Sequence, residues 1–548
     1  DAGADAYNVA VGYDAGKLVS TGVRNIIIGG DAGVTMTSAS YSVAIGYNAL
    51  GDEGTNSHNV AIGDASMSSS EYSAKNVAVG SNALQNVTHG SSTDTYNTAV
   101  GYNAGINVTS GIRNTLVGGL AGDALTQGAY NTALGMFALS SEDDHGMNTA
   151  VGYGALEQQN AGADAYNTAV GYVAGTAITT GALNTIIGGS AGQALTSGAR
   201  NILIGVRAGD ALTDGNYNVA IGYQALTDDD QGEYNTAIGY FALENYSGGD
   251  GEGSNTITGA FAGRNISTGQ FNAAFGSNSI GNGTTTGNYN TAVGHYTGYN
   301  LTSGTQNVLL GGFAGDNITT GTRNIAIGYN ALGAEDEHSY NVAIGHQALK
   351  VQNAGANAYN VAIGYDAGLS VSTGVQNTIM GGLAGDALTT GSYNVALGYR
   401  ALGAEDAHGN NTAIGYSALR LQNAGEDAYN VALGYNAGEN VSTGTSNVLL
   451  GSQAGDALTT GSHNVAVGRG ALGGEDAHGR NVAVGHEALN SQDAGANATN
   501  VAMGYEAGHD VSTGKWNTII GGNAGDALTT GDNNIVIGYN AAASAVDV

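Results

Sequence analysis

The sequence has no cysteine, no proline, a single tryptophan and few charged residues. The missing cysteines exclude disulfide bonds and thiolate metal sites, and they are compatible with an oxidising exterior, where a free thiol is a liability. Charged residues make up 11% of the chain, against roughly 25% in an ordinary soluble domain. The surface must therefore be covered by Asn, Ser, Thr, Gly and Tyr, which is not the composition of a series of ordinary globular domains.

Positive charge is especially scarce. The chain has 14 Lys plus Arg against 45 Asp plus Glu, a net charge of −31. Such a chain repels nucleic acid phosphates and anionic membranes, so we expect no nucleic acid partner. No stretch approaches the roughly 18 apolar residues of a membrane span, and we expect the chain not to be membrane-inserted. Because 42% of its residues are apolar, we also expect it to be ordered.

The sequence consists of a short repeat. Asn360 to Tyr429 reads as four segments of one pattern, NVAIGYDAGLSVSTGVQ, NTIMGGLAGDALTTGSY, NVALGYRALGAEDAHGN and NTAIGYSALRLQNAGEDAY. Three segments have 17 residues and the fourth has 19. We call each group of four a tile, because the opening Asn recurs every 70 residues, at Asn290, Asn360, Asn430 and Asn500.

The segment length decides the fold class. Seventeen residues are too few for the helix pair or propeller blade of longer repeats, which need roughly 33 to 45. They suffice for two short strands and two turns. We therefore predict an all-β fold, a parallel β-solenoid (β-roll or β-helix) of about 31 rungs, with one rung per segment. We expect one continuous repeat domain over residues 1–548, with irregular segments near 76–97 and 235–290.

The strand of each segment has one bulky face and one flat face. Side chains alternate along a strand, so Val361 and Ile363 point one way while Ala362 and Gly364 point the other. We interpret the small residues as a packing face against another copy of the chain, and the alternative is a smooth, solvated wall. The residues named for this packing face are Ala362, Gly364, Ala432 and Gly434. A glycine within a strand also indicates a close approach of two backbones.

The opening asparagines are predicted to form a ladder, because stacked rungs superimpose equivalent residues about 4.8 Å apart. Each side-chain amide can donate to one neighbouring rung and accept from the other. The residues assigned to this structural ladder are Asn290, Asn307, Asn324, Asn341, Asn360, Asn377, Asn394, Asn411, Asn430, Asn447, Asn464 and Asn481.

Tyrosines recur just before the opening Asn, as at Tyr359 and Tyr429, and just after the Gly, as at Tyr365 and Tyr435. Such rows can stack on sugar rings or contact a neighbouring chain, because a tyrosine combines an apolar ring with a polar hydroxyl. The alternative, which we favour, is that the tyrosines stack on one another at the corners of the solenoid.

A third recurring element combines acidic residues with histidine, in EDDHG (142–146), AEDEHS (334–339), AEDAHG (404–409) and GEDAHG (474–479). Glu, Asp and His so close together could hold a divalent ion. Each tile has one such loop and no denser cluster of ligands, so we favour a solvated loop. GGLAGDALTT (381–390) departs from the calcium-binding nonapeptide in its glycine spacing, and its paired threonines are too infrequent for an ice-binding face.

No set of residues predicts an active site. Ser, His and Asp occur only in repeated turns, without a unique constellation of nucleophile, base and oxyanion donors. We therefore expect no enzyme, no catalytic or metal-binding residues and no cofactor.

The motifs NVAIG, NTAVG and NVALG, with their trailing Ala and TG turns, resemble the head repeats of trimeric autotransporter adhesins and the repeats of phage and bacterial tail fibres. The resemblance implies a left-handed β-roll or related β-helix, assembled as a coaxial trimer and displayed outside the cell. We expect an extracellular structural fibre, on a cell or virion surface, that forms homo-oligomeric filaments. The alternative is an adhesin or receptor-binding fibre that attaches to glycans.

The chain opens with DAGADAY, the closing part of a 19-residue segment, and its last segment keeps the strand motif through Gly538. We recognise no polar capping segment, which a solenoid uses to cover its exposed ends. We therefore expect chains to join end to end, the alternative being a piece of a longer chain.

Overall fold

The computed structural model describes residues 5–249 and 251–542. Within these ranges every regular element is a β-strand, and none of the described residues forms a helix that is long and apolar enough to cross a bilayer. The chain divides into two compact units, Asp1–Asn272 and Ala273–Val548, and each is described by itself. The prediction of one continuous domain stays a prediction.

Both units consist of three-residue strands, one in each rung. Those of the first unit are β1 (Val9–Val11), β2 (Ile26–Ile28), β3 (Val43–Ile45), β4 (Val60–Ile62), β6 (Val77–Val79), β8 (Thr98–Val100), β9 (Thr115–Val117), β10 (Thr132–Leu134), β11 (Thr149–Val151), β12 (Thr168–Val170), β13 (Thr185–Ile187), β14 (Ile202–Ile204), β15 (Val219–Ile221), β16 (Thr236–Ile238) and β17 (Thr256–Thr258). Those of the second unit are β18 (Ala273–Phe275), β19 (Thr291–Val293), β20 (Val308–Leu310), β21 (Ile325–Ile327), β22 (Val342–Ile344), β23 (Val361–Ile363), β24 (Thr378–Met380), β25 (Val395–Leu397), β26 (Thr412–Ile414), β27 (Val431–Leu433), β28 (Val448–Leu450), β29 (Val465–Val467), β30 (Val482–Val484), β31 (Val501–Met503), β32 (Thr518–Ile520) and β33 (Ile535–Ile537).

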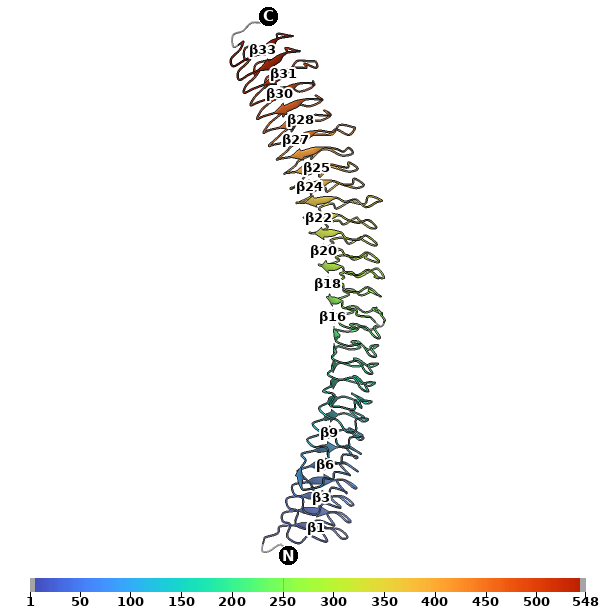
Figure 1. Cartoon of the computed structure of the whole chain (residues 1–548). Coiled ribbons are helices and arrows are strands. Elements are labelled where there is room, and N and C mark those ends of the chain that lie inside the picture. The colour runs from blue at the N-terminus through green and yellow to red at the C-terminus, as the bar shows by residue number, and fades with distance from the viewer. Residues whose placement is uncertain (1–4, 250, 543–548) are drawn as a thin grey trace. The chain divides into compact units, whose positions relative to one another are not determined.

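Within each unit a strand pairs in parallel with the equivalent strand of the next rung. In β23 and β24, Val361 pairs with Thr378 and Ala362 with Ile379, so that equivalent residues face each other. Figure 1 shows the strands of each unit stacked one above another. The predicted fold class is confirmed: the protein is an all-β parallel solenoid of about 31 rungs at roughly 17-residue spacing.

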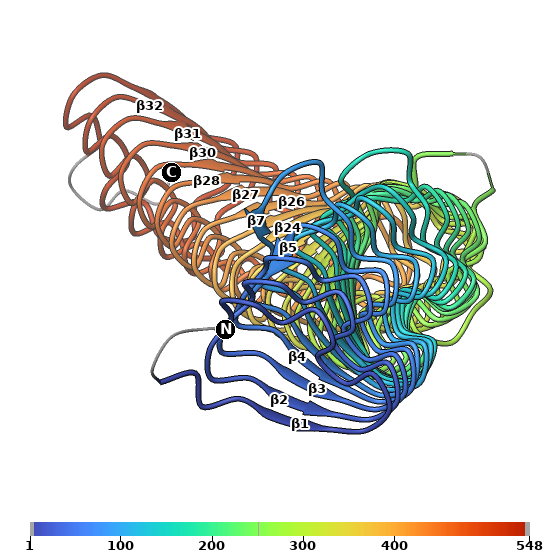
Figure 2. The ribbon, with the colours of Figure 1, turned by 90° about the horizontal axis from the view of Figure 1, so that it is seen from below.

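Each rung contains one strand, where we predicted two. The rest of the rung is a series of tight turns, because residues in the left-handed region interrupt any extended run, as at Leu383 (φ 55°) and Tyr393 (φ 62°). Backbone hydrogen bonds still join these turns between rungs, for example from Ser372 N to Thr389 O at 2.8 Å. Figure 2, which looks along the stack, shows each rung coiling around the interior.

The interior is filled by alanines together with larger aliphatic side chains. Ala362 in the strand, Ala367 in the following turn and Val371 in the next are all fully buried within the chain. The packing of the alanine face against another copy is therefore wrong for Ala362 and Ala432, which are both 0% exposed in the single chain. The middle side chain of each strand points into this interior, Ala362 in one rung and the larger Ile379 in the next, while the first and third point outward.

Gly364 and its equivalents directly follow each strand, at a position where the backbones of successive rungs lie in close contact. Gly364 has φ +144°, and a Cβ on it would lie 2.5 Å from the carbonyl oxygen of Gly381 in the next rung. Gly434 (φ +147°) meets Gly451 in the same way. These glycines are half-buried, and they belong to the contact between rungs of one chain.

The irregular segments contain extra local structure. In the first unit, β5 (Ser73–Ala74) pairs in parallel with β7 (Thr93–Asp94) beside the 21-residue step, and Glu233 bridges Glu252 beside the 20-residue step. The expected end-to-end joint involves DAGADAY (1–7) and the last segment, up to 548, and of these residues 1–4 and 543–548 lie outside the described residues.

Candidate functional site

The twelve ladder asparagines named from the sequence are all buried, at 1% exposure or less. The Oδ1 of Asn360 accepts a hydrogen bond from the backbone N–H of Asn377 at 2.8 Å, and its Nδ2 donates to the carbonyl of Gly374 at 2.7 Å. Most contacts in this row therefore run from side chain to backbone. Direct amide-to-amide bonds also occur, as from Asn307 Nδ2 to Asn290 Oδ1 at 3.0 Å. The row is structural, because it satisfies backbone groups that would otherwise be buried without partners.

The first and third residues of each strand point out of the solenoid, and we call the surface they form the outer strand face. Val431 is 36% and Leu433 47% exposed, although both are large apolar side chains. None of the three-residue strands of the described chain contains a charged residue. The outer strand face is thus an uncharged, largely aliphatic strip along each unit.

Tyrosine rows border this strip. After the glycine, Tyr399 stacks on Tyr416 at 5.5 Å between ring centroids, and Tyr416 stacks on Tyr435 at 5.3 Å. Before the asparagine, Tyr340 stacks on Tyr359 at 4.9 Å. The rings thus stack on one another along the solenoid and are also well exposed, Tyr435 by 54%. They contribute aromatic area to the same surface as the aliphatic strip.

The positions of the core side chains alternate within a tile. Rungs one and two have glycine four residues after the strand glycine (Gly368, Gly385) and a large residue, Val or Leu, seven residues after it. Rungs three and four differ: the fourth residue after the strand glycine is leucine instead of glycine (Leu402, Leu419). A side chain on Gly385 would crowd Leu388 in its own rung. Leucine at the fourth position therefore leaves the seventh open to a polar residue, which is Glu405 in rung three and Gln422 in rung four.

These polar residues are buried, as are their equivalents in the other tiles. The glutamates of the four Glu–His loops are 0% exposed: Glu142, Glu335, Glu405 and Glu475. The expectation of a solvated loop is therefore wrong for the glutamate, although the aspartate that follows it in each of these loops is half-buried or exposed. The sequence signal for this burial is that each glutamate lies 17 residues after a core Leu or Ile.

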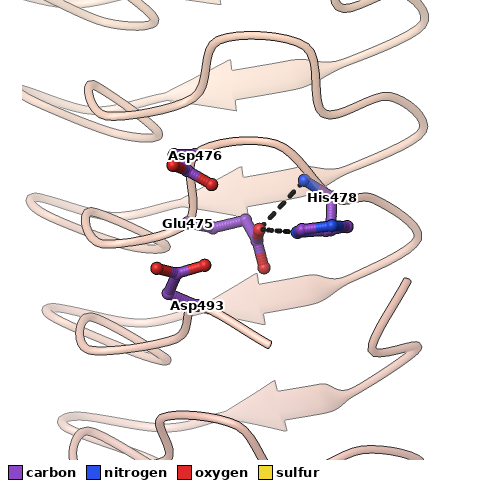
Figure 3. A group of neighbouring side chains, drawn as sticks. All are labelled: Glu475, Asp476, His478 and Asp493. Carbon is purple, nitrogen blue, oxygen red and sulfur yellow. Dashed lines mark hydrogen bonds and ion pairs between the residues drawn. The ribbon is translucent and has the colours of Figure 1, made fainter. Parts of the chain in front are cut away.

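In each Glu–His loop the glutamate contacts the histidine three residues later. Glu475 Oε1 accepts from the backbone N–H of His478 at 3.0 Å and lies 3.3 Å from its Nδ1 (Figure 3). The same Oε1 to Nδ1 distance is 3.1 Å for Glu335 and His338, and 3.8 Å for Glu142 and His145. Burial raises the pKa of all four carboxyl groups, and that of Glu142 reaches about 7.

Glu475, Asp476, His478 and Asp493 bring possible ligand atoms within 4.8 Å of one another. Both oxygens of Glu475 already accept protein hydrogen bonds, Oε1 from His478 and Oε2 from Asn481 at 3.4 Å. Asp476 and Asp493 lie beside Glu475 in Figure 3 but are exposed. We therefore interpret this cluster as a buried, hydrogen-bonded Glu–His pair. The expectations of no metal, no cofactor and no enzymatic activity stay predictions.

No protein-family model matches the chain, and no curated protein sequence matches it. The parallel solenoid fits β-helix repeat proteins in general, while the likeness to adhesin heads and tail fibres depends on the repeated strand motif alone.

Proposed function

We propose that the protein is an extracellular structural fibre whose chains associate side by side through the outer strand face. The fold is consistent with a structural or fibre-like repeat protein. The observation that carries the proposal is this uncharged aliphatic strip on a chain of net charge −31. Like-charged copies repel each other, so they associate best through a surface without charge.

The strip is large enough for a stable contact. Strands about 4.8 Å apart, with about 3.3 Å per residue, make a strip of about 760 Å² over the strands β18 to β33. A standard interface buries about 800 Å² on each partner, and the bordering tyrosine rows add to the strip. A coaxial trimer, which the adhesin resemblance implies, is the arrangement we propose for these copies, and the absence of cysteine suits a location outside the cell.

The test places charge on the outer strand face. The double substitution Val431→Lys and Leu433→Lys puts two exposed cations where a second copy would bury them unpaired, which is strongly unfavourable. We expect the wild type to sediment as an oligomer and the double variant to shift towards smaller species. Thr373→Lys, on an exposed turn of the same unit, adds charge elsewhere and should leave sedimentation unchanged. A monomeric wild type, or an equal effect of Thr373→Lys, would contradict the proposal.

A core substitution separates association from folding. Ala432→Leu adds volume to a fully buried position, and overpacking typically costs about 1–3 kcal/mol. We expect it to lower the melting temperature of the chain, whereas the lysine variants on the outer strand face should keep the far-ultraviolet circular dichroism of the wild type.

The exposed tyrosine rows favour a second function, attachment to glycans. Ring faces arranged in a row can stack on successive sugars. Replacing Tyr416 and Tyr435 by alanine should then abolish binding to a glycan array without changing sedimentation. Loss of sedimentation as an oligomer in this variant would instead assign the tyrosines to the contact between chains.

A further inference from the structure

Each Glu–His loop places an acid at a core position of the solenoid. Glu405 follows Val371 and Leu388 at the same place in successive rungs, and Gln422 follows it in the next rung. All four side chains are fully buried. An ionised carboxylate at such a position is costly unless a cation or several hydrogen-bond donors accompany it.

The donors around each glutamate are few. Glu405 Oε1 accepts from the backbone N–H of His408 at 3.1 Å and faces its Nδ1 at 3.5 Å. Its Oε2 has no hydrogen-bond partner, and the same is true of Oε2 in Glu142. The Oε2 atoms of Glu335 and Glu475 accept only long bonds, of 3.3 and 3.4 Å, from a ladder asparagine.

Histidine is also the only cationic side chain among the charged groups that act on these glutamates. The acidic groups are Asp143 and Asp164 near Glu142, Asp336 near Glu335, Asp406 near Glu405, and Asp476 and Asp493 near Glu475. No Lys or Arg is among the groups that act on these glutamates in the described chain. When the glutamate loses its proton, a buried carboxylate remains beside further acids.

We propose that the four Glu–His loops are proton-linked latches, which hold the third rung of a tile closed while the buried glutamate keeps a proton and open locally when that proton is lost. The backbone that would open is identified by its hydrogen bonds. Thr389 N donates to Asp406 O at 2.5 Å and Thr390 N donates to the same oxygen at 3.1 Å, joining rung two to the residue after Glu405. The proposal does not depend on how the chains associate.

The direction of the effect follows from the buried carboxyl. Burial raises the pKa of each glutamate above its value of about 4.3 in an unfolded chain, so the closed loop holds a proton that the open loop releases. The latch is therefore fully stabilised below about pH 4.3, and its stabilisation is lost as the pH rises through the raised pKa. For Glu142 that pKa is about 7. Its loop therefore loses this stabilisation between weakly acidic and neutral pH, and the loss is complete in mildly alkaline solution.

Hydrogen exchange of the full chain, corrected for the intrinsic effect of pH, tests the proposal. We expect the segment around 389–408 to lose protection between pH 5 and pH 8.5, because burial raises the pKa of Glu405 and the open loop releases its proton. Glu405→Gln should keep this segment protected at both pH values, because glutamine is neutral and already occupies the equivalent position at Gln422. The loop at 474–480 of the same variant keeps its glutamate and should still open.

Two further variants decide the role of each partner. Asp406→Asn removes the exposed neighbouring acid and should leave the pH dependence in place. His408→Asn keeps the backbone N–H that donates to Glu405 but removes the imidazole, which also lowers the pKa of Glu405, so the midpoint of opening should move to higher pH. An unchanged pH dependence in Glu405→Gln, or equal protection of the wild-type loops at both pH values, would overturn the proposal.

Discussion

A single ladder asparagine stabilises backbone groups in two rungs at once. Asn394 Oδ1 accepts from the N–H of Asn411 at 3.0 Å, and its Nδ2 donates to the carbonyl of His408 at 3.2 Å. Asn394→Ala should leave both groups buried without a partner, at about 1–3 kcal/mol each. We therefore expect a lower urea midpoint, with lost exchange protection of the Asn411 amide, which donates to the Asn394 side chain. Gln376→Ala, an exposed residue of the same tile, should change stability by less than about 0.5 kcal/mol.

Alanine substitutions at two glycines of neighbouring rungs distinguish the cost of steric crowding from the cost of an unfavourable backbone φ. Gly364→Ala combines φ +144° with a Cβ placed 2.5 Å from the next backbone, and we expect a cost well above the roughly 1–3 kcal/mol of an unfavourable φ alone. Gly355→Ala has φ +68° and open space around the new methyl group, so about 1 kcal/mol is expected. Thermal unfolding of the two variants measures the difference, and similar losses would show that the rungs can move apart.

At the scale of one rung, burial of a carboxyl without a histidine gives a second dependence on pH. Glu53 is 1% exposed and accepts from Asn59 Nδ2 at 2.7 Å, and burial raises its pKa to about 8. Its contribution to stability is therefore complete below about pH 4.3 and is lost as the pH rises towards 8, at about 1.4 kcal/mol for each pKa unit.

Melting curves of the wild type and Glu53→Gln at pH 5 and pH 8.5 check this dependence. We expect the melting temperature of the wild type to fall more between the two pH values than that of Glu53→Gln. Asp52→Asn changes an exposed neighbour and should behave like the wild type. The same drop in all three proteins would assign the dependence on pH to other groups.

The period of the repeat was enough to predict the rungs and their register, because a deletion or shift of one residue would place every side chain on the wrong face. It was not enough to predict which face is inside. Val361 and Ile363 have the apolar area that usually marks a core, yet Ala362 between them is the buried residue of this strand. Which face lies inside depends on core side chains outside the strand, such as Val371 in the same rung and Leu388 in the next.

The burial of the glutamates has the same origin. Within one segment, AEDAHG has the composition of a solvated turn. Only alignment with the preceding rung shows that Glu405 occupies the position of Leu388. In the same alignment Leu402 occupies the position of Gly385. A sequence interpretation that aligns the four rungs of a tile, position by position, would find this exchange.

At the scale of the molecule, each rung within a unit pairs only with its immediate neighbours, so stability is close to a sum of rungs and of the contacts between them. A whole tile should then be removable. Deleting residues 360–429 joins Tyr359 to Asn430, and this recreates the Tyr–Asn junction that Tyr429 and Asn430 already make. The new neighbours keep their register: β22 would pair with β27, whose alternation of exposed and buried residues matches that of β23. We expect the shortened chain to keep the circular dichroism per residue of the full chain and to unfold at nearly the same temperature.

Deleting only 360–368 removes one strand and its glycine but not the rest of its rung, which shifts the ladder asparagine and the core positions out of register. That variant should lose cooperative unfolding and bind a hydrophobic dye, and a tile deletion that behaved in the same way would mean that stability depends on contacts beyond neighbouring rungs.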